Sequence, residues 1–156
     1  MTDARWLDAF GDIADACHHL AGGLAISAQW EALATRNEYM ANMAIMHSFQ
    51  SAYTSLENAF LVILEILDEG EPTGRNWHTD LLRRLATVVE GEQARPALLD
   101  REMLLDLTEL KNFRHRAMHG YGGFEFGRMA STIEAARRVN DRILANVTAF
   151  KQLVDA

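Results

Sequence analysis

Apolar residues recur at every third or fourth position along almost the whole chain, which is the period of one face of an α-helix. No segment shows the sustained alternation of apolar and polar residues that is typical of a half-buried strand. The pattern therefore predicts an all-α fold, in which amphipathic helices bury their apolar faces against one another.

The first predicted helix begins after Thr2, and we expect Gly22 and Gly23 to interrupt it because glycine is a poor helix former. Thr35 and Glu38 have the spacing of a capping box, which predicts a short helix up to about Ala34 and a long one from about Arg36. The predicted apolar face of the long helix consists of Tyr39, Met43, Met46, Phe49, Tyr53, Leu56, Phe60, Ile63 and Leu67.

Glycine and proline in residues 69–74 predict a reversal of the chain, followed by a helix over about 79–90 and a second loop over 91–96. Asp100 is the predicted N-cap of the next helix, which continues to the glycines after residue 119. The last helix is expected from about residue 128, with an apolar seam that faces the bundle or a second subunit.

Short loops between these helices predict an up-and-down antiparallel bundle of four main helices plus an N-terminal helix. At 156 residues the chain fits a single domain. We divide this domain into an N-terminal helical extension, residues 1–34, and a bundle core, residues 35–156. The extension is expected to cover the bundle, to extend a dimer or to bind a partner protein.

Composition narrows the functional classes. The chain has a net charge of −7 and one cysteine, and it has neither a leader-like N-terminus nor a long apolar run. These features favour a cytoplasmic protein without membrane insertion. An acidic chain is also a poor candidate for broad coating of nucleic acid, which needs many phosphate contacts. Any contact with nucleic acid is therefore expected to be local.

A basic segment, residues 111–119, stands out against this charge. It contains three cations and two histidines without a carboxylate. Its charged and titratable members are Lys111, Arg114, His115, Arg116 and His119. Such a segment suits phosphate, although cations near the end of a helix also complement the helix dipole.

Arg114 and His119 have the chemistry that phosphodiester cleavage requires. A guanidinium can hold two phosphate oxygens and stabilise their charge, whereas an imidazole can gain or lose a proton near neutral pH. His115 and His119 have the spacing of metal ligands on a helix, but no neighbouring Cys, Asp or Glu completes a set. We therefore predict neither a metal nor a cofactor.

Five residues of ideal helix rotate by about 500°, which leaves Arg114 and His119 roughly 140° apart. The two side chains are therefore not expected to converge on one straight helix face. Either the helix unwinds before Gly120, or a second protomer contributes to a shared site. We favour the dimer.

Arg114, four intervening residues, His119, one residue and Tyr121 reproduce an RX4HXY motif. Tyr53 and Glu57, four residues apart on the long helix, provide further context, as do the Phe-Arg-His run that contains Arg114 and the Trp77-His78 pair. On these residues the chain resembles the HepT-like toxins of the HEPN superfamily, over about residues 39–150.

The resemblance implies a homodimeric, metal-independent endoribonuclease, the toxin of a type VII (HEPN/MNT) toxin–antitoxin system. It further implies a nucleotidyltransferase (MNT-type) antitoxin that neutralises the toxin by AMPylation of Tyr121. Arg114 and His119 would then be catalytic, with His119 acting as acid or base. The residue after the motif arginine is often asparagine in this family, and it is His115 here.

Roles for the surrounding residues follow from the same hypothesis. His115, Arg116 and Lys111 are candidates for RNA binding, although His115 could also merely pack. Glu57 and Tyr53 are candidates for supporting the motif side chains. His18, His19, His47 and His78 are predicted to be structural. The alternative to a toxin is a non-catalytic HEPN-like module that binds RNA or a nucleotide.

Overall fold

The structure is a computed structural model, and it describes residues 3–119 and 124–155. Within these ranges the chain is all-α, as predicted, and forms no strand beyond an isolated bridge between Val89 and Arg95. The elements are α1 (Arg5–Ala28), α2 (Trp30–Ile66), α3 (Trp77–Leu85), α4 (Arg101–His119), the 3-10 turn η1 (Phe126–Arg128) and α5 (Ala130–Val154). None of the described helices is both long and apolar enough to cross a membrane.

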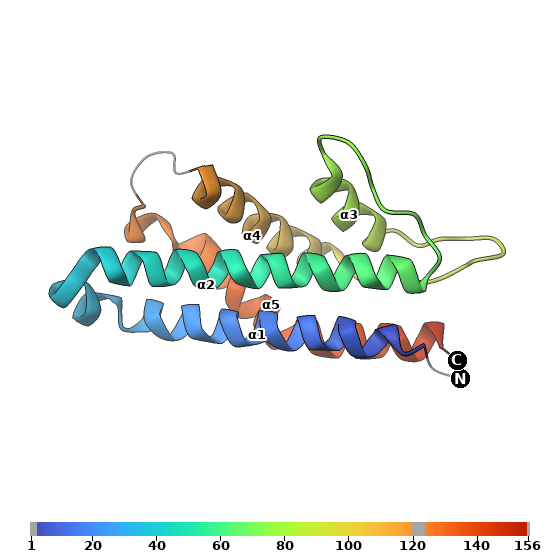
Figure 1. Ribbon diagram of the computed structural model, residues 1–156, viewed down its shortest axis with the longest axis horizontal. Helices are drawn as coiled ribbons and strands as arrows, with labels where there is room; N and C mark the ends of the chain where they lie inside the picture. Colours follow the sequence, from blue (N-terminus) through green and yellow to red (C-terminus); the bar gives the residue numbers. More distant parts are fainter. Residues whose placement is uncertain (1–2, 120–123, 156) are drawn as a thin grey trace.

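Helices α1 and α2 lie side by side and antiparallel along the long axis of the molecule (Figure 1). α1 belongs to the hydrophobic core, because five of its side chains are fully or almost fully buried. They are Trp6, Ala9, Ile13, Ala16 and Leu20. The N-terminal extension therefore covers the bundle, which is one of the three roles expected for it.

The predicted break at Gly22 and Gly23 is wrong, because α1 continues through both residues to Ala28. Gly23 is buried against α2, where a β-carbon would lie only 2.5 Å from Cε1 of Phe49. Gly22 has open space around it. Gly23 thus lets the two helices approach closely, and packing against α2 outweighs the weak helix propensity of glycine.

The predicted boundary between the short and the long helix, near Ala34, lies instead at Asn37. The helix direction changes at Asn37, which alone within α2 has a non-helical backbone, with φ −159° and ψ 94°. Asn37 caps the following segment, because its Oδ1 accepts a hydrogen bond from the Met40 amide at 3.0 Å. The hydroxyl of Thr35 instead donates to the Glu31 carbonyl, so Thr35 is not the predicted capping residue.

The predicted apolar face of the long helix is confirmed only from its middle onward. Tyr39 and Met43 are exposed, with 73% and 37% of their surface accessible. The buried face instead runs through Ala41, Ile45 and Phe49, four residues apart. This face is the one that α1 covers.

The third helix ends at Leu85 and not near residue 90 as predicted. The chain after it is held by Arg95, a buried side chain whose Nε lies 2.6 Å from Oε2 of Glu69 at the end of α2. Arg95 also donates to the carbonyls of Arg84 and Thr87. Because the Arg84 carbonyl belongs to the last turn of α3 and that of Thr87 follows it, the buried guanidinium satisfies groups that a longer helix would have bonded internally.

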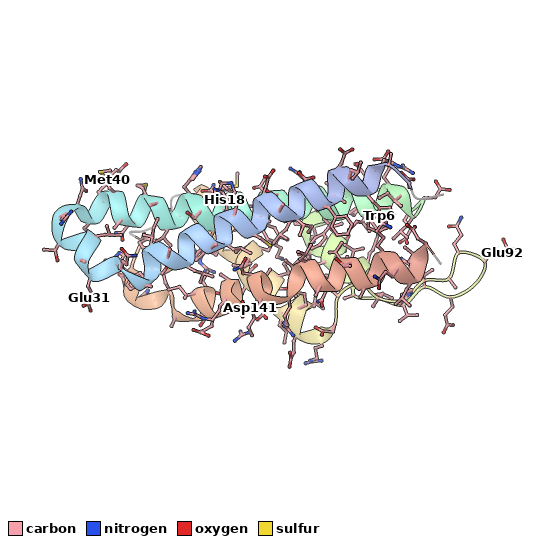
Figure 2. The ribbon with its side chains drawn as sticks, turned by 90° about the horizontal axis from the view of Figure 1, so that it is seen from below. Trp6, His18, Glu31, Met40, Glu92 and Asp141 are labelled. Atoms are coloured by element: carbon pink, nitrogen blue, oxygen red, sulfur yellow. The ribbon has the colours of Figure 1, made fainter. Side chains whose placement is uncertain are left out.

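The remaining helices match the predictions more closely. Asp100 caps α4 as predicted, with Oδ1 accepting from the Met103 amide at 2.7 Å. α5 begins two residues later than expected, and its apolar seam is buried within the same chain. Its end lies beside the start of α1 at one end of the bundle, while Glu31 and Met40 lie at the other (Figures 1 and 2).

We predict opposite effects for two neighbouring substitutions in α1. Gly23→Ala should lower the melting temperature, because the new methyl group overpacks against the buried Phe49 ring, at a cost of about 1–3 kcal/mol. Gly22→Ala is the matched control and should stabilise the protein by up to about 1 kcal/mol. Thermal unfolding followed by circular dichroism measures both, and equal effects would contradict the close approach of α1 and α2.

Candidate functional site

A cleft of about 600 Å³ lies over α2, between α3 and the second half of α4. Figure 1 shows these three helices on one side of the molecule. The lining consists of Thr54, Arg75, Asn76, His78, Thr79, Lys111, Asn112, Arg114, His115, Met118 and His119. Among these residues are three cations and three histidines but no carboxylate, so the cleft is a local basic surface on an acidic chain.

Arg114, which lines the cleft, forms an ion pair beneath it with Glu57, which does not line it. The Glu57 side chain is 5% exposed and that of Arg114 is 12% exposed, and Nη1 lies 2.9 Å from Oε1. Glu57 lies on the buried face of α2, where an unpaired carboxylate would be very unfavourable. The pair therefore fixes the position of α4 relative to α2 and orients the guanidinium.

Two further side chains of α2 complete the surroundings of Arg114. Its guanidinium lies over the ring of Tyr53, 5.0 Å from the centroid, in a cation–π arrangement. Nη1 also donates to Oγ1 of Thr54 at 3.2 Å. These contacts engage Nη1, whereas Nε makes no hydrogen bond with the described residues and remains for a ligand. Glu57 and Tyr53, both predicted as support, thus contact the motif arginine directly.

Tyr53 remains a neutral phenol in this setting. Burial is the main cause that raises its pKa well above the usual range, and the nearby Glu57 carboxylate adds to the effect. Its side chain is fully buried, and its hydroxyl makes no hydrogen bond with the described residues. Tyr53 therefore acts on Arg114 through its ring face.

His78 joins this network and lines the cleft, although the sequence suggested no partner for it. Its Nδ1 is hydrogen-bonded to Oε2 of Glu57, and Nη2 of Arg114 lies 3.2 Å from the same nitrogen. Sequence reasoning missed His78 and Thr54 because neither belongs to the motif. The available signal was Glu57 itself, since a carboxylate on an apolar helix face calls for buried cationic or hydrogen-bonding partners.

His119 and Arg114 line the same cleft, although α4 remains helical through residue 119. The cleft-lining residues of α4 cover about 160° of its circumference at 100° per residue, with Arg114 at the inner edge and His119 near the outer one. From the sequence, we considered only an unwound helix or a second chain as ways to bring the two side chains together. One broad cleft along a regular helix is a third way, and it contains both side chains. His115 lies beside His119, with ring centroids 4.3 Å apart.

The other predicted site residues have different positions. Lys111 lines the cleft, and its Nζ donates to Oγ1 of Thr79 at 2.7 Å, which ties α4 to α3. Arg116 is not among the lining residues, and its exposed side chain lies 3.9 Å from Glu109. Tyr121 lies outside the described residues. Nowhere in residues 3–119 and 124–155 do three or more His, Cys, Asp or Glu form a cluster suited to a metal ion.

We predict strong coupling between Glu57 and Arg114. Replacing either residue by Ala should lower the unfolding free energy by about 3–5 kcal/mol, because each change leaves an uncompensated buried charge. The double variant should lose far less than the sum of the two. Denaturant unfolding of the four proteins measures the coupling. The exposed pair Glu134 and Arg137 is the control, and coupling there should stay below about 1 kcal/mol.

The region that forms the cleft is similar in sequence to a known protein family. Residues 44–154 match a protein family described as HepT-like protein. No curated protein and no solved structure gives a significant match to the chain. The matched region contains α3, α4, α5 and most of α2, and hence every described residue of the cleft, whereas α1 lies outside it. Because the match spans most of the chain, this protein belongs to the HepT-like family.

Proposed function

We propose that the protein is a metal-independent RNA endonuclease and the toxin of a type VII (HEPN/MNT) toxin–antitoxin system. The observation that carries this proposal is the single basic cleft that contains both Arg114 and His119 of the RX4HXY motif. Membership of the HepT-like family supports the same conclusion.

The proposed reaction is transesterification by the ribose 2′-hydroxyl. The 2′-oxygen attacks phosphorus, the bond to the 5′-oxygen breaks, and a 2′,3′-cyclic phosphate and a 5′-hydroxyl are formed. Arg114 would hold the phosphate through the edge of its guanidinium that carries Nε and stabilise the charge that develops on the phosphoryl oxygens. His119 would carry a proton to or from the reacting oxygens.

Other cleft residues would bind the rest of the RNA. Lys111 and Arg75 lie on the cleft wall, where they are positioned to contact phosphates on either side of the cleaved bond. His115, next to His119, would contact the substrate as well. Arg116 does not line the described cleft and would reach only a longer substrate, so it is the weakest member of the predicted binding set.

We further propose that the active toxin is a homodimer in which the two clefts face a shared groove, so that one RNA contacts both chains. The family resemblance motivates this step. Met118, a large apolar side chain at the cleft with 64% of its surface exposed, would lie at the contact between the two chains.

Neutralisation would come from an MNT-type nucleotidyltransferase that attaches AMP to Tyr121. Tyr121 follows His119 by two positions in the sequence. A phosphate linked there would bring negative charge and bulk toward the basic cleft, and it would compete with RNA for the same cations.

A non-catalytic RNA- or nucleotide-binding module is the second candidate. The ion pair between Arg114 and Glu57 favours it, because the buried carboxylate already neutralises the motif cation and gives it a structural role. The net charge of −7 also weakens attraction to RNA outside the cleft.

The ribonuclease proposal predicts that the purified protein cleaves single-stranded RNA in excess EDTA and leaves a cyclic phosphate end. His119→Ala should lower the cleavage rate by about 10²–10⁴-fold, because a proton-transfer group is lost. His18→Ala, on the outer surface of α1 (Figure 2), is the matched control and should cleave at the wild-type rate. Gel analysis of end-labelled RNA measures both variants.

Loss of cleavage in EDTA would contradict the metal-independent mechanism. Binding of RNA by the wild-type protein without any cleavage would instead favour the non-catalytic module. Equal circular dichroism spectra for the wild type and the His119→Ala variant would exclude misfolding as the cause of a lost rate.

The regulatory proposal predicts that the toxin expressed alone arrests growth and that co-expression of a cognate MNT-type antitoxin restores it. Intact mass measurement of the co-expressed protein should show added AMP. Tyr121→Phe should remain toxic without modification and should no longer be rescued, because the acceptor hydroxyl is missing. A Tyr121→Phe protein that still gains AMP would place the modification on another residue.

A further inference from the structure

His78 is placed differently from every other histidine in the chain. It lies in the first turn of α3, lines the cleft opposite the wall formed by α4, and is hydrogen-bonded through Nδ1 to the buried Glu57. His115 and His119, by contrast, both belong to the last turns of α4. The cleft therefore has imidazoles on two walls that come from different helices.

The contact with Glu57 decides which nitrogen of His78 carries the proton. Oε2 of an ionised carboxylate is only an acceptor, and its partner Oε1 is paired with Arg114. Nδ1 must therefore be the donor to Oε2, since two acceptors at hydrogen-bond distance would repel each other. Nη2 of Arg114 can only donate, so it lies beside Nδ1 without a hydrogen bond to it, and the shared Glu57 carboxylate offsets the repulsion between the two donors. We assign the proton of the neutral imidazole to Nδ1, so that Nε2 keeps its lone pair.

The ring is also fixed in orientation. The side chain of Trp77 lies against it, with ring centroids 3.7 Å apart and a tilt of 31°. Nη2 of Arg114 lies 3.2 Å from Nδ1 on the buried side. The His78 side chain is 35% exposed, and Nε2 makes no hydrogen bond with the described residues. Of the two ring nitrogens, Nδ1 is thus engaged by Glu57, and Nε2 remains for a substrate in the cleft that His78 lines.

A carboxylate that holds the Nδ1–H of a histidine, and so presents Nε2 to a substrate hydroxyl, is a known arrangement for a general base. The carboxylate keeps the correct tautomer and stabilises the imidazolium that forms. Here the same carboxylate also holds the phosphate-binding arginine. Glu57 therefore aligns a base and a phosphate clamp from two helices on one reacting group.

We propose that His78 is the general base of the cleavage reaction and that His119 is the general acid. This inference rests on the ribonuclease function proposed above. Nε2 of His78 takes the proton of the 2′-hydroxyl as the 2′-oxygen bonds to phosphorus. The bond from phosphorus to the 5′-oxygen breaks, and this oxygen takes a proton from the His119 imidazolium. Exchange with water then returns both histidines to their starting states.

This assignment gives each protomer a base, an acid and a phosphate clamp of its own. A second copy of the chain would then be needed for RNA binding or stability, and not to complete the proton transfers. It also explains why Glu57 is retained at a core position, where a pair of apolar side chains would pack without burying charge.

The test compares two variants on two substrates. One substrate is RNA, and the other is uridine 3′-(4-nitrophenyl phosphate), whose nitrophenolate leaves without needing a proton. His78→Asn retains a side-chain N–H for Glu57 but lacks a basic nitrogen, and His18→Asn is the same change outside the cleft. Thermal unfolding of all variants checks that they fold.

We expect His78→Asn to lose about 10²–10⁴-fold in rate on both substrates, because the 2′-hydroxyl must lose its proton in each case. His119→Ala should lose a comparable factor on RNA and recover to within about tenfold of the wild type on the nitrophenyl ester, because no acid is needed there. His18→Asn should match the wild type on both.

Three results would overturn the assignment, and they separate it from the function on which it rests. His78→Asn cleaving RNA at nearly the wild-type rate, while His119→Ala is slow, would remove His78 from the chemistry and leave the ribonuclease function intact. Recovery of His78→Asn on the nitrophenyl ester would make His78 the acid. A wild-type protein inactive on both substrates would end the proposed function itself.

Discussion

The buried carboxylate of Glu57 is the constraint on which the site depends. It lies on the core face of α2 and is shared by Arg114 of α4 and His78 of α3. A charge at such a position is tolerated only if its partners satisfy it fully, because desolvation without pairing costs several kcal/mol. Three helices therefore have to meet at this carboxylate for the fold to be stable, and the same meeting builds the cleft. Stability and proposed chemistry are in this sense carried by one interaction.

The rest of the bundle holds α2 and α4 in the register that this interaction needs. Gly23 lets α1 approach α2 beside Phe49, and the Phe49 ring meets the ring of Phe113 edge to face, with centroids 6.0 Å apart. Phe113 immediately precedes Arg114, so this aromatic contact fixes the helix position from which the guanidinium reaches Glu57. On the other side of α4, Asp106 is paired with Arg138 of α5. The N-terminal helix, which lies outside the matched family region, thus supports the site through the core without contributing to its lining.

Charge is distributed so that an acidic protein can still receive a phosphate. Most cations outside the cleft are paired with carboxylates. The described residues that line the cleft include no carboxylate. Attraction to RNA would therefore be short-ranged and confined to the cleft, and recognition would depend on a few phosphates. This arrangement would suit the proposed ribonuclease, because it confines phosphate binding to the cleft. The HepT-like fold alone does not fix that chemistry, which rests on the particular side chains in the cleft.

Local sequence was enough to predict the helical class, the cap at Asp100, the buried seam of α5 and the basic segment with its motif, because each depends on neighbours within a few residues. It also indicated that Glu57 and Tyr53 support Arg114. It misplaced the helix boundaries at Gly23 and Leu85, where packing and long-range hydrogen bonds outweigh local propensity. It also chose Thr35 over Asn37, although Asn37 is the residue that caps the following turn. It could not find His78, which lies 21 residues from Glu57 and 36 from Arg114 in the chain. Only the folded bundle brings these three side chains together, since the need to pair a buried charge is met by whichever residues tertiary packing places beside it.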